Sequence, residues 1–224
     1  MAHARRHSAS DCRVLSDSKI ECLTVEGTGG PHHAIVHAVG GQSSSISSAS
    51  LSYGSPVITD FSGPASNGAS TLGGQTITIE GLNFGTNSGD VNDVWCRDSV
   101  DDTLFKADNC TVAIPHRQLH CRTPQGPASS RLDWQVVVDG MASTAPYTSS
   151  ASPTISAVSL VDGSSASTSG GDRFLVSGSE FGVRDDRIAS VTLVGPGTES
   201  VAQLGVTRHC RRVQTHVSTC LRTD

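Results

Sequence analysis

Apolar and polar residues alternate in short runs along much of this 224-residue chain. Residues 76–80 and 134–139 place an apolar side chain at every second position, and Phe174 and Val176 repeat the pattern. This is the period of a β-strand with one buried face. Turns rich in Gly, Ser and Asn separate the runs, for example at residues 87–89. No segment shows a sustained apolar stripe at helical spacing, so the pattern predicts an all-β fold of antiparallel sandwiches.

A pair of cysteines about ten residues apart recurs three times along the chain. The three pairs are Cys12 and Cys22, Cys110 and Cys121, and Cys210 and Cys220. Successive pairs lie roughly 100 residues apart, which is the length of one small β-sandwich domain. Gly-Gly followed by Gly-x-x-Phe-Gly also recurs, at residues 73–85 and 170–182. The chain is therefore predicted to consist of tandem copies of one unit.

The landmarks divide the chain into one complete unit and two partial ones. Residues 56–152 carry every landmark of the unit. Residues 1–55 are interpreted as the C-terminal half of a first unit, and residues 153–224 as a third unit that lacks its last strand. Two explanations stay open at this point. The sequence is a window on a longer array, or the partial units of neighbouring molecules complete each other.

The residues of the complete unit resemble a known family. Pro56-Val57-Ile58 begins it, Gly73-Gly74 and Gly81-Leu82-Asn83-Phe84-Gly85 follow, and Cys110 precedes Cys121-Arg122-Thr123-Pro124. Together they resemble the IPT/TIG domain, an immunoglobulin-like sandwich of plexins, other cell-surface proteins and Rel-type transcription factors. The flanking segments resemble the family only as halves, and the third has Leu221-Arg222-Thr223 without the proline. The resemblance implies tandem sandwiches that act as spacers, adhesive modules or dimerisation modules.

The spacing of the cysteines predicts a disulfide within each pair. Such local pairs are typical of an oxidising compartment, and we therefore expect the protein outside the cell or at its surface. The alternative is three pairs of reduced, buried cysteines that pack as small apolar side chains. Cys96 is the seventh cysteine and has no partner. It is either buried and inert or bonded to another chain.

Composition and charge exclude several classes of protein. A net charge of −5 at pH 7 argues against nucleic acid as a partner, because phosphate binding needs clustered Lys and Arg. No apolar run approaches the roughly 20 residues that span a bilayer, so no direct membrane insertion is expected. The first residues lack the apolar core of a secretory signal. If the protein is exported, we expect either a signal upstream of this sequence or a biological start other than Met1.

One sequence motif predicts covalent sugar. Asn109-Cys110-Thr111 is the only Asn-x-Ser/Thr sequence in the chain, which makes Asn109 an acceptor for an N-linked glycan in a secreted protein. Ser- and Thr-rich runs at residues 43–52 and 144–152 lie between the units. They are interpreted either as carriers of O-linked sugar or as plain flexible linkers.

Two groups of residues raise the question of a metal. His32, His33 and His37 lie in a predicted strand, where residues four apart are about 13 Å apart, so ordinary strand histidines are expected. Six polar residues form an acidic stretch without the spacing of a calcium loop, and a solvated loop is expected there. They are Asp90, Asn92, Asp93, Asp98, Asp101 and Asp102. No metal is predicted at either place.

The chain is predicted not to be an enzyme. It contains no nucleophile elbow, no phosphate-binding loop and no zinc-protease motif, and no cofactor is expected. Phe84 and Phe181, in the two Gly-x-x-Phe-Gly motifs, are predicted to pack in the core.

The open units suggest a function in assembly. In the register read from the sequence, Ile35 and His37 take the places of Trp134 and Val136. The segment Ile35, Val36, His37, Ala38 and Val39 is then a candidate strand to complete the third unit of another copy. The first hypothesis is a segment of an extracellular filament or surface coat whose partners are other copies of itself or neighbouring IPT/TIG repeats. The second is an adhesive or ligand-binding ectodomain segment of a plexin-like receptor, and the third an accessory domain of a secreted carbohydrate-active enzyme.

Overall fold

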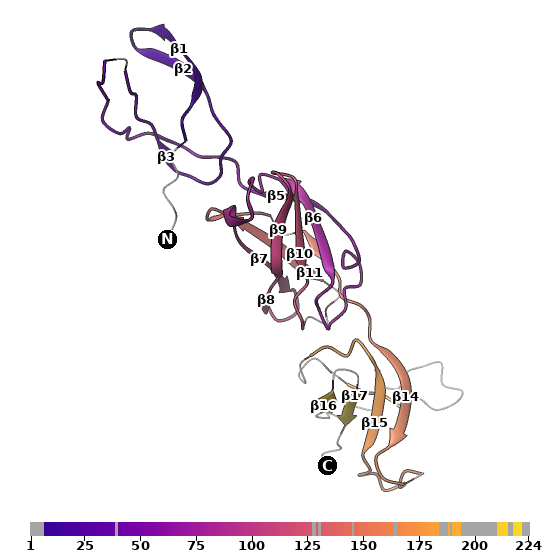
Figure 1. Cartoon of the computed structure of the whole chain (residues 1–224). Coiled ribbons are helices and arrows are strands. Elements are labelled where there is room, and N and C mark those ends of the chain that lie inside the picture. The colour runs from indigo at the N-terminus through magenta and orange to yellow at the C-terminus, as the bar shows by residue number, and fades with distance from the viewer. Residues whose placement is uncertain are drawn as a thin grey trace.

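The computed structural model shows three β units that follow one another along the chain (Figure 1). The structure describes residues 7–38, 40–126, 129, 131–144, 146–163, 165–183, 188, 190–193, 210–214 and 217–220, the last two ranges by their backbone alone. The fold is all-β, as the alternating pattern predicts, and the described part adds only the 3-10 turn η1 (Ser88–Asp90).

The first sheet of the central unit has four antiparallel strands. Their spatial order is β5 (Val57–Ser62), β6 (Thr76–Leu82), β10 (Gln118–Arg122) and β9 (Asp108–Ile114). Along β6 the apolar Ile77 and Ile79 are buried, while Thr76, Thr78 and Glu80 are partly exposed. The two-residue period of the sequence is therefore the period of burial.

The second sheet of the central unit packs face to face with the first. Its spatial order is β12 (Met141–Ala142), β11 (Leu132–Val138), β7 (Val91–Asp98) and β8 (Leu104–Lys106), and β13 (Tyr147–Thr148) also pairs with β11. Trp134 fills the space between the sheets, with its ring centroid 6.0 Å from that of Phe61. Its indole N–H donates to Thr148 Oγ1 at 2.7 Å, which satisfies the one polar atom of the ring.

The third unit repeats the first sheet of the central one. Its strands are, in spatial order, β14 (Thr154–Leu160), β15 (Phe174–Ser179), β17 (Val217–Cys220) and β16 (Cys210–Gln214). Three cross-strand residue pairs of the central unit recur at equivalent positions of the third. In the central unit they are Ile58↔Gly81, Phe61↔Ile79 and Ile77↔Cys121. In the third unit they are, in the same order, Ile155↔Gly178, Val158↔Val176 and Phe174↔Cys220. The sequence repeat is thus also a repeat of strand order and register.

Two glycines show why the Gly-x-x-Phe-Gly motif recurs. A Cβ atom on Gly81 would overlap the carbonyl oxygen of Val57 and the ring of Phe84. A Cβ atom on Gly178 would overlap the equivalent carbonyl and the ring of Phe181. Both phenylalanine rings are buried. Each ring therefore packs on a strand position that only glycine can occupy, and the prediction that both rings belong to the core is confirmed.

The first unit contains two short pairs of strands. β1 (Ser10–Ser16) and β2 (Lys19–Leu23) form a hairpin, and β3 (His32–His33) pairs with β4 (Ser50–Leu51). The hairpin corresponds to β9 and β10 of the central unit, because in each case the residue before the first cysteine has a positive φ, 47° at Asp11 and 49° at Asn109.

The register that the sequence suggests for Ile35 and His37 is wrong by one position. Val36 N–H donates to Ser44 Oγ at 3.0 Å, and Ser44 N–H donates to the carbonyl oxygen of Val36 at 2.9 Å. Val136 and Ser143 make the same two bonds at 3.0 and 2.9 Å. Val36 therefore takes the place of Val136. The hairpin turn of the first unit holds one residue more than that of the central unit, which shifts the register of the residues before the turn by one.

Candidate functional site

The inner face of β14 and β15 in the third unit is the most prominent candidate for a binding surface among the described residues. The inner face of β14 and β15 borders a cavity of about 560 Å³, with Leu160, Phe174 and Leu193 in its lining. Val158 also lines the cavity and is 52 % exposed. In the central unit the equivalent Phe61 packs on Trp134. Among the described residues of the third unit, no side chain takes the place of that tryptophan.

The predicted strand donor lies at the surface of the first unit. Ile35, Val36, His37 and Ala38 are all exposed, and Val39 lies outside the described residues. This segment forms hydrogen bonds with residues 42–47. The edge that makes these bonds corresponds to the edge of β11 that pairs with β12 in the central unit. The opposite edge of β11 pairs with β7. Within the described part of the first unit, no strand pairs with that opposite edge.

The comparisons with known proteins bear on the central unit. Residues 56–151 match the family model of the IPT/TIG domain. The central unit is an IPT/TIG domain. A search of curated proteins finds no match to the chain. IPT/TIG domains are generally non-catalytic, immunoglobulin-like modules of surface or adhesion type. The match therefore indicates a module of this general kind for residues 56–151.

Two of the three predicted disulfides are present in the structure. Cys12 bonds to Cys22, and Cys110 bonds to Cys121 within the IPT/TIG domain. Each closes a loop of about ten residues, which the chain-entropy account values at about 2–3 kcal/mol. The side chains of Cys210 and Cys220 lie outside the described residues, but their Cα atoms are paired directly across β16 and β17. That third bond stays a prediction.

Cys96 lies in the core of the IPT/TIG domain. It is fully buried on the inner face of β7, directly opposite Trp134 in the register with β11. Burial raises the pKa of its thiol to about 12, an effect to which the nearby Asp98 adds. Of the two alternatives left by the sequence, this position favours the buried, inert thiol over a bond to another chain.

Asn109 is placed where a glycan could be attached. It is exposed in β9, and so is Thr111, which completes the acceptor sequence. The positive φ of Asn109 turns the backbone just before Cys110. Both side chains that an N-glycosylating enzyme must reach are therefore accessible, and the modification itself stays a prediction.

The acidic stretch of the IPT/TIG domain is not the solvated loop that the sequence suggests. Asp90 and Asp98 are 1 % and 0 % exposed. Asp90 Oδ2 accepts from the backbone N–H groups of Thr86 and Asn87 at 3.1 and 3.2 Å, and Asp98 Oδ1 accepts from Val100 N–H at 2.8 Å. These two carboxylates shape the turns on either side of β7, a role invisible in composition alone.

The three predicted strand histidines have separate hydrogen-bond partners. His32 Nε2 lies 3.1 Å from the carbonyl oxygen of Thr28. His33 Nδ1 lies 2.9 Å from that of Ser47, and His37 Nδ1 lies 2.8 Å from Ser43 Oγ. In the part of the chain that the structure describes, no three His, Cys, Asp or Glu side chains converge as metal ligands. No described helix is long and apolar enough to cross a membrane.

The contacts between units were not predicted from the sequence. Glu180 of the third unit accepts from Ser70 Oγ at 2.9 Å, from Thr71 N–H at 2.6 Å and from Thr71 Oγ1 at 2.8 Å. Thr71 is buried in the IPT/TIG domain. Both carboxylate oxygens of Glu180 are therefore engaged across the joint.

The joint between the first unit and the IPT/TIG domain uses similar groups. Thr28 Oγ1 donates to the carboxylate of Asp139. His116 Nε2 lies 3.2 Å from Glu26 Oε1. Hydrogen bonds between residues far apart in the sequence thus connect each outer unit to the IPT/TIG domain. Glu180 lies in the second Gly-x-x-Phe-Gly motif, at one of its variable positions, so the motif does not mark it as a contact residue. Thr28, Asp139, His116 and Glu26 are common polar residues that belong to no motif of the sequence.

Proposed function

We propose that the chain is a non-enzymatic extracellular structural protein, a segment of a filament or surface coat that assembles head to tail by strand complementation. The observation that carries this proposal is a pair of complementary surfaces in the described residues of the two outer units. The third unit offers an apolar inner face, and the first unit offers a segment equivalent to β11 with one unpaired edge in its described part. The IPT/TIG domain shows how such surfaces fit within one sandwich.

The fit follows from the register of the structure. In the donated segment Ala34 and Val36 take the places of Trp134 and Val136 and would face the cavity of the next molecule. Ile35 would then point outward. Ala34 is much smaller than tryptophan, but Phe174 stands where the IPT/TIG domain has Ile77 and supplies extra volume from the opposite sheet.

The duplicated hairpins limit what is exchanged. β1 and β2 of the first unit correspond to β16 and β17 of the third, so both pairs cannot occupy one sandwich. Only the segment around residues 34–38 is donated in the proposed assembly. The disulfides favour an oxidising environment for it.

Electron microscopy of the native protein, without denaturant or reductant, is the first test. We expect filaments with an axial repeat equal to a whole number of sandwich domains. Val36→Asp should abolish them because it places a carboxylate in the apolar cavity. Ile35→Asp is the matched control and should leave them intact, because its side chain faces solvent. Val158→Asp and Ala157→Asp form the corresponding pair on the acceptor side, because Val158 lines the cavity and the exposed Ala157 does not.

Dispersed particles at all concentrations would contradict assembly and favour the second candidate. That candidate is an adhesive or ligand-binding ectodomain segment of a plexin-like surface receptor, supported by the surface-type role of IPT/TIG domains. It predicts rods attached to a membrane in native material. Equal loss of filaments in Val36→Asp and Ile35→Asp would also contradict strand donation in the register given above.

A further inference from the structure

The outer face of the second sheet of the IPT/TIG domain carries two aromatic side chains. Trp95 on β7 lies directly opposite Gln135 on β11. One row further along, Arg97, Asp133 and Tyr147 lie side by side across β7, β11 and β13. The alternate residues of β7 and β11 face the core. The chain has only two Trp and two Tyr residues, and one of each meets on this surface.

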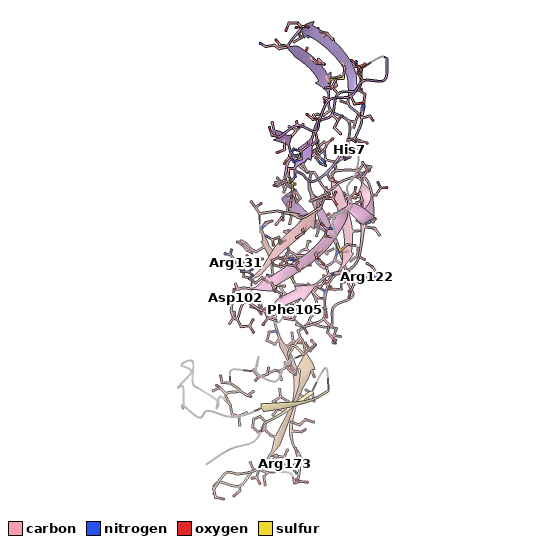
Figure 2. All side chains as sticks on the ribbon, turned by 90° about the vertical axis from the view of Figure 1, so that its left-hand side faces the viewer. His7, Asp102, Phe105, Arg122, Arg131 and Arg173 are labelled. Atoms are coloured by element: carbon pink, nitrogen blue, oxygen red, sulfur yellow. A yellow bond between two sulfur atoms is a disulfide. The ribbon has the colours of Figure 1, made fainter. Side chains whose placement is uncertain are left out.

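Both rings are held in place by arginines. The guanidinium carbon of Arg131 lies 4.6 Å from the centroid of the Tyr147 ring, and that of Arg97 lies 5.6 Å from the centroid of the Trp95 ring. Tyr147 is nevertheless 61 % exposed, so most of its ring remains open to a ligand. Arg131 projects from the flank of the central unit (Figure 2). A cation on one side of a ring fixes its orientation before any ligand arrives.

The charges on this face compensate one another. Arg131 Nε lies 2.9 Å from Asp133 Oδ1, Lys106 Nζ lies 2.5 Å from Asp93 Oδ1, and Arg97 Nη1 lies 3.9 Å from Asp102 Oδ1. A surface with paired charges does not attract a polyanion or a polycation over a distance. It suits a neutral ligand that offers many hydroxyl groups to planar polar side chains.

We propose that this face, defined by Trp95, Arg97, Arg131, Asp133, Gln135 and Tyr147, binds a neutral oligosaccharide. Sugar rings have apolar C–H faces that pack on aromatic rings, while their hydroxyl edges reach carboxylate, amide and guanidinium groups. Trp95 and Tyr147 are two strands and two residues apart, which corresponds to about 12 Å across the sheet. That separation allows one short chain of sugars to contact both rings at once.

Titration calorimetry with cellohexaose, chitohexaose and maltohexaose tests the proposal on the full chain. We expect at least one of them to bind and to change the tryptophan fluorescence. Trp95→Ala and Tyr147→Ala should each weaken that binding about tenfold. His120→Ala, an exposed side chain on the other sheet, is the matched control and should bind like the wild type. Unchanged thermal unfolding of each variant shows that the domain remains folded.

Absence of binding to all three sugars at millimolar concentration would overturn the proposal, and so would equal binding by the two aromatic variants and the wild type. The proposal does not depend on filament assembly. Val36→Asp, which removes the proposed strand donor, should bind sugar normally. Failure of one proposal is therefore distinguishable from failure of the other.

Discussion

Burial sets the reactivity of Cys96, the one cysteine that belongs to none of the three predicted disulfide pairs. Its thiol sits between two sheets, and the pKa of about 12 follows from the loss of hydration of the thiolate. An ordinary cysteine has a pKa near 8.5 and reacts through its thiolate. At pH 8 the thiolate of Cys96 is therefore populated to only about one part in ten thousand.

We expect Cys96 to resist thiol reagents in the native protein at pH 8. Labelling with iodoacetamide, followed by mass spectrometry of the peptides, should show Cys96 modified only after unfolding in guanidinium. Ser99→Cys, an exposed position just beyond β7, is the positive control and should be labelled at once. Rapid native labelling of Cys96 would show that the second sheet opens far more readily than its packing implies.

Residue-scale predictions from the sequence succeeded where a local pattern fixes the environment. The spacing of Cys110 and Cys121 anticipated a bond that the register of β9 and β10 allows. The prediction of a solvated loop for the acidic stretch was wrong at Asp90 and Asp98. Their carboxylates are buried and accept hydrogen bonds from backbone N–H groups of neighbouring turns, a contact that the order of residues alone does not reveal. Composition reports how many charges a stretch carries and not which of them are buried.

At the scale of elements, Gly81 links strand pairing to core packing. Its Cα lies against the Val57 carbonyl and the ring of Phe84. Gly81→Ala should lower the free energy of unfolding by about 1–3 kcal/mol, because the added methyl group forces strand and ring apart. Chemical denaturation with tryptophan fluorescence measures the change.

Gly89→Ala is the matched control for that substitution. Gly89 has no atom near the position of an added Cβ and no positive φ. It should change the unfolding free energy by less than about 0.5 kcal/mol. If the two variants are equally stable, the contact between Gly81 and Phe84 does not matter for the stability of the domain.

The elements themselves were largely predictable, and their exact pairing was not. A period of two identifies β6 and β11 from the sequence because each has one buried face. The same period cannot detect one extra residue in a turn, and so the sequence pattern places Ile35 rather than Val36 on the inner face. A one-residue slip exchanges the two faces of a strand.

For the whole molecule, Glu180 is the side chain that joins the third unit to the IPT/TIG domain. Glu180→Ala leaves the buried N–H and hydroxyl groups of Thr71 without these acceptors, at a cost of about 1–3 kcal/mol for each donor left unsatisfied. We expect the joint to loosen while each sheet stays folded. Small-angle X-ray scattering in the Val36→Asp background should show a broader range of molecular dimensions.

Glu80→Ala is the control for the joint. Glu80 accepts from Gln118 within the IPT/TIG domain, with Oε1 and Nε2 3.0 Å apart, so its loss should leave the scattering curve unchanged. Glu180→Gln keeps one acceptor oxygen and should fall between the wild type and Glu180→Ala. Identical curves for the wild type and Glu180→Ala would mean that other contacts fix the joint.

The loop that holds Glu180 also has a counterpart at the other joint. Asn83 occupies the same position of Gly-x-x-Phe-Gly, has the same φ of 62°, and donates through Nδ2 to the carbonyl oxygen of Ser55, the residue before the IPT/TIG domain. The central and third units thus each carry, at the same position of this loop, a side chain that hydrogen-bonds to the segment before them. A unit that is duplicated together with this loop therefore brings with it one of the side chains that contact the preceding unit.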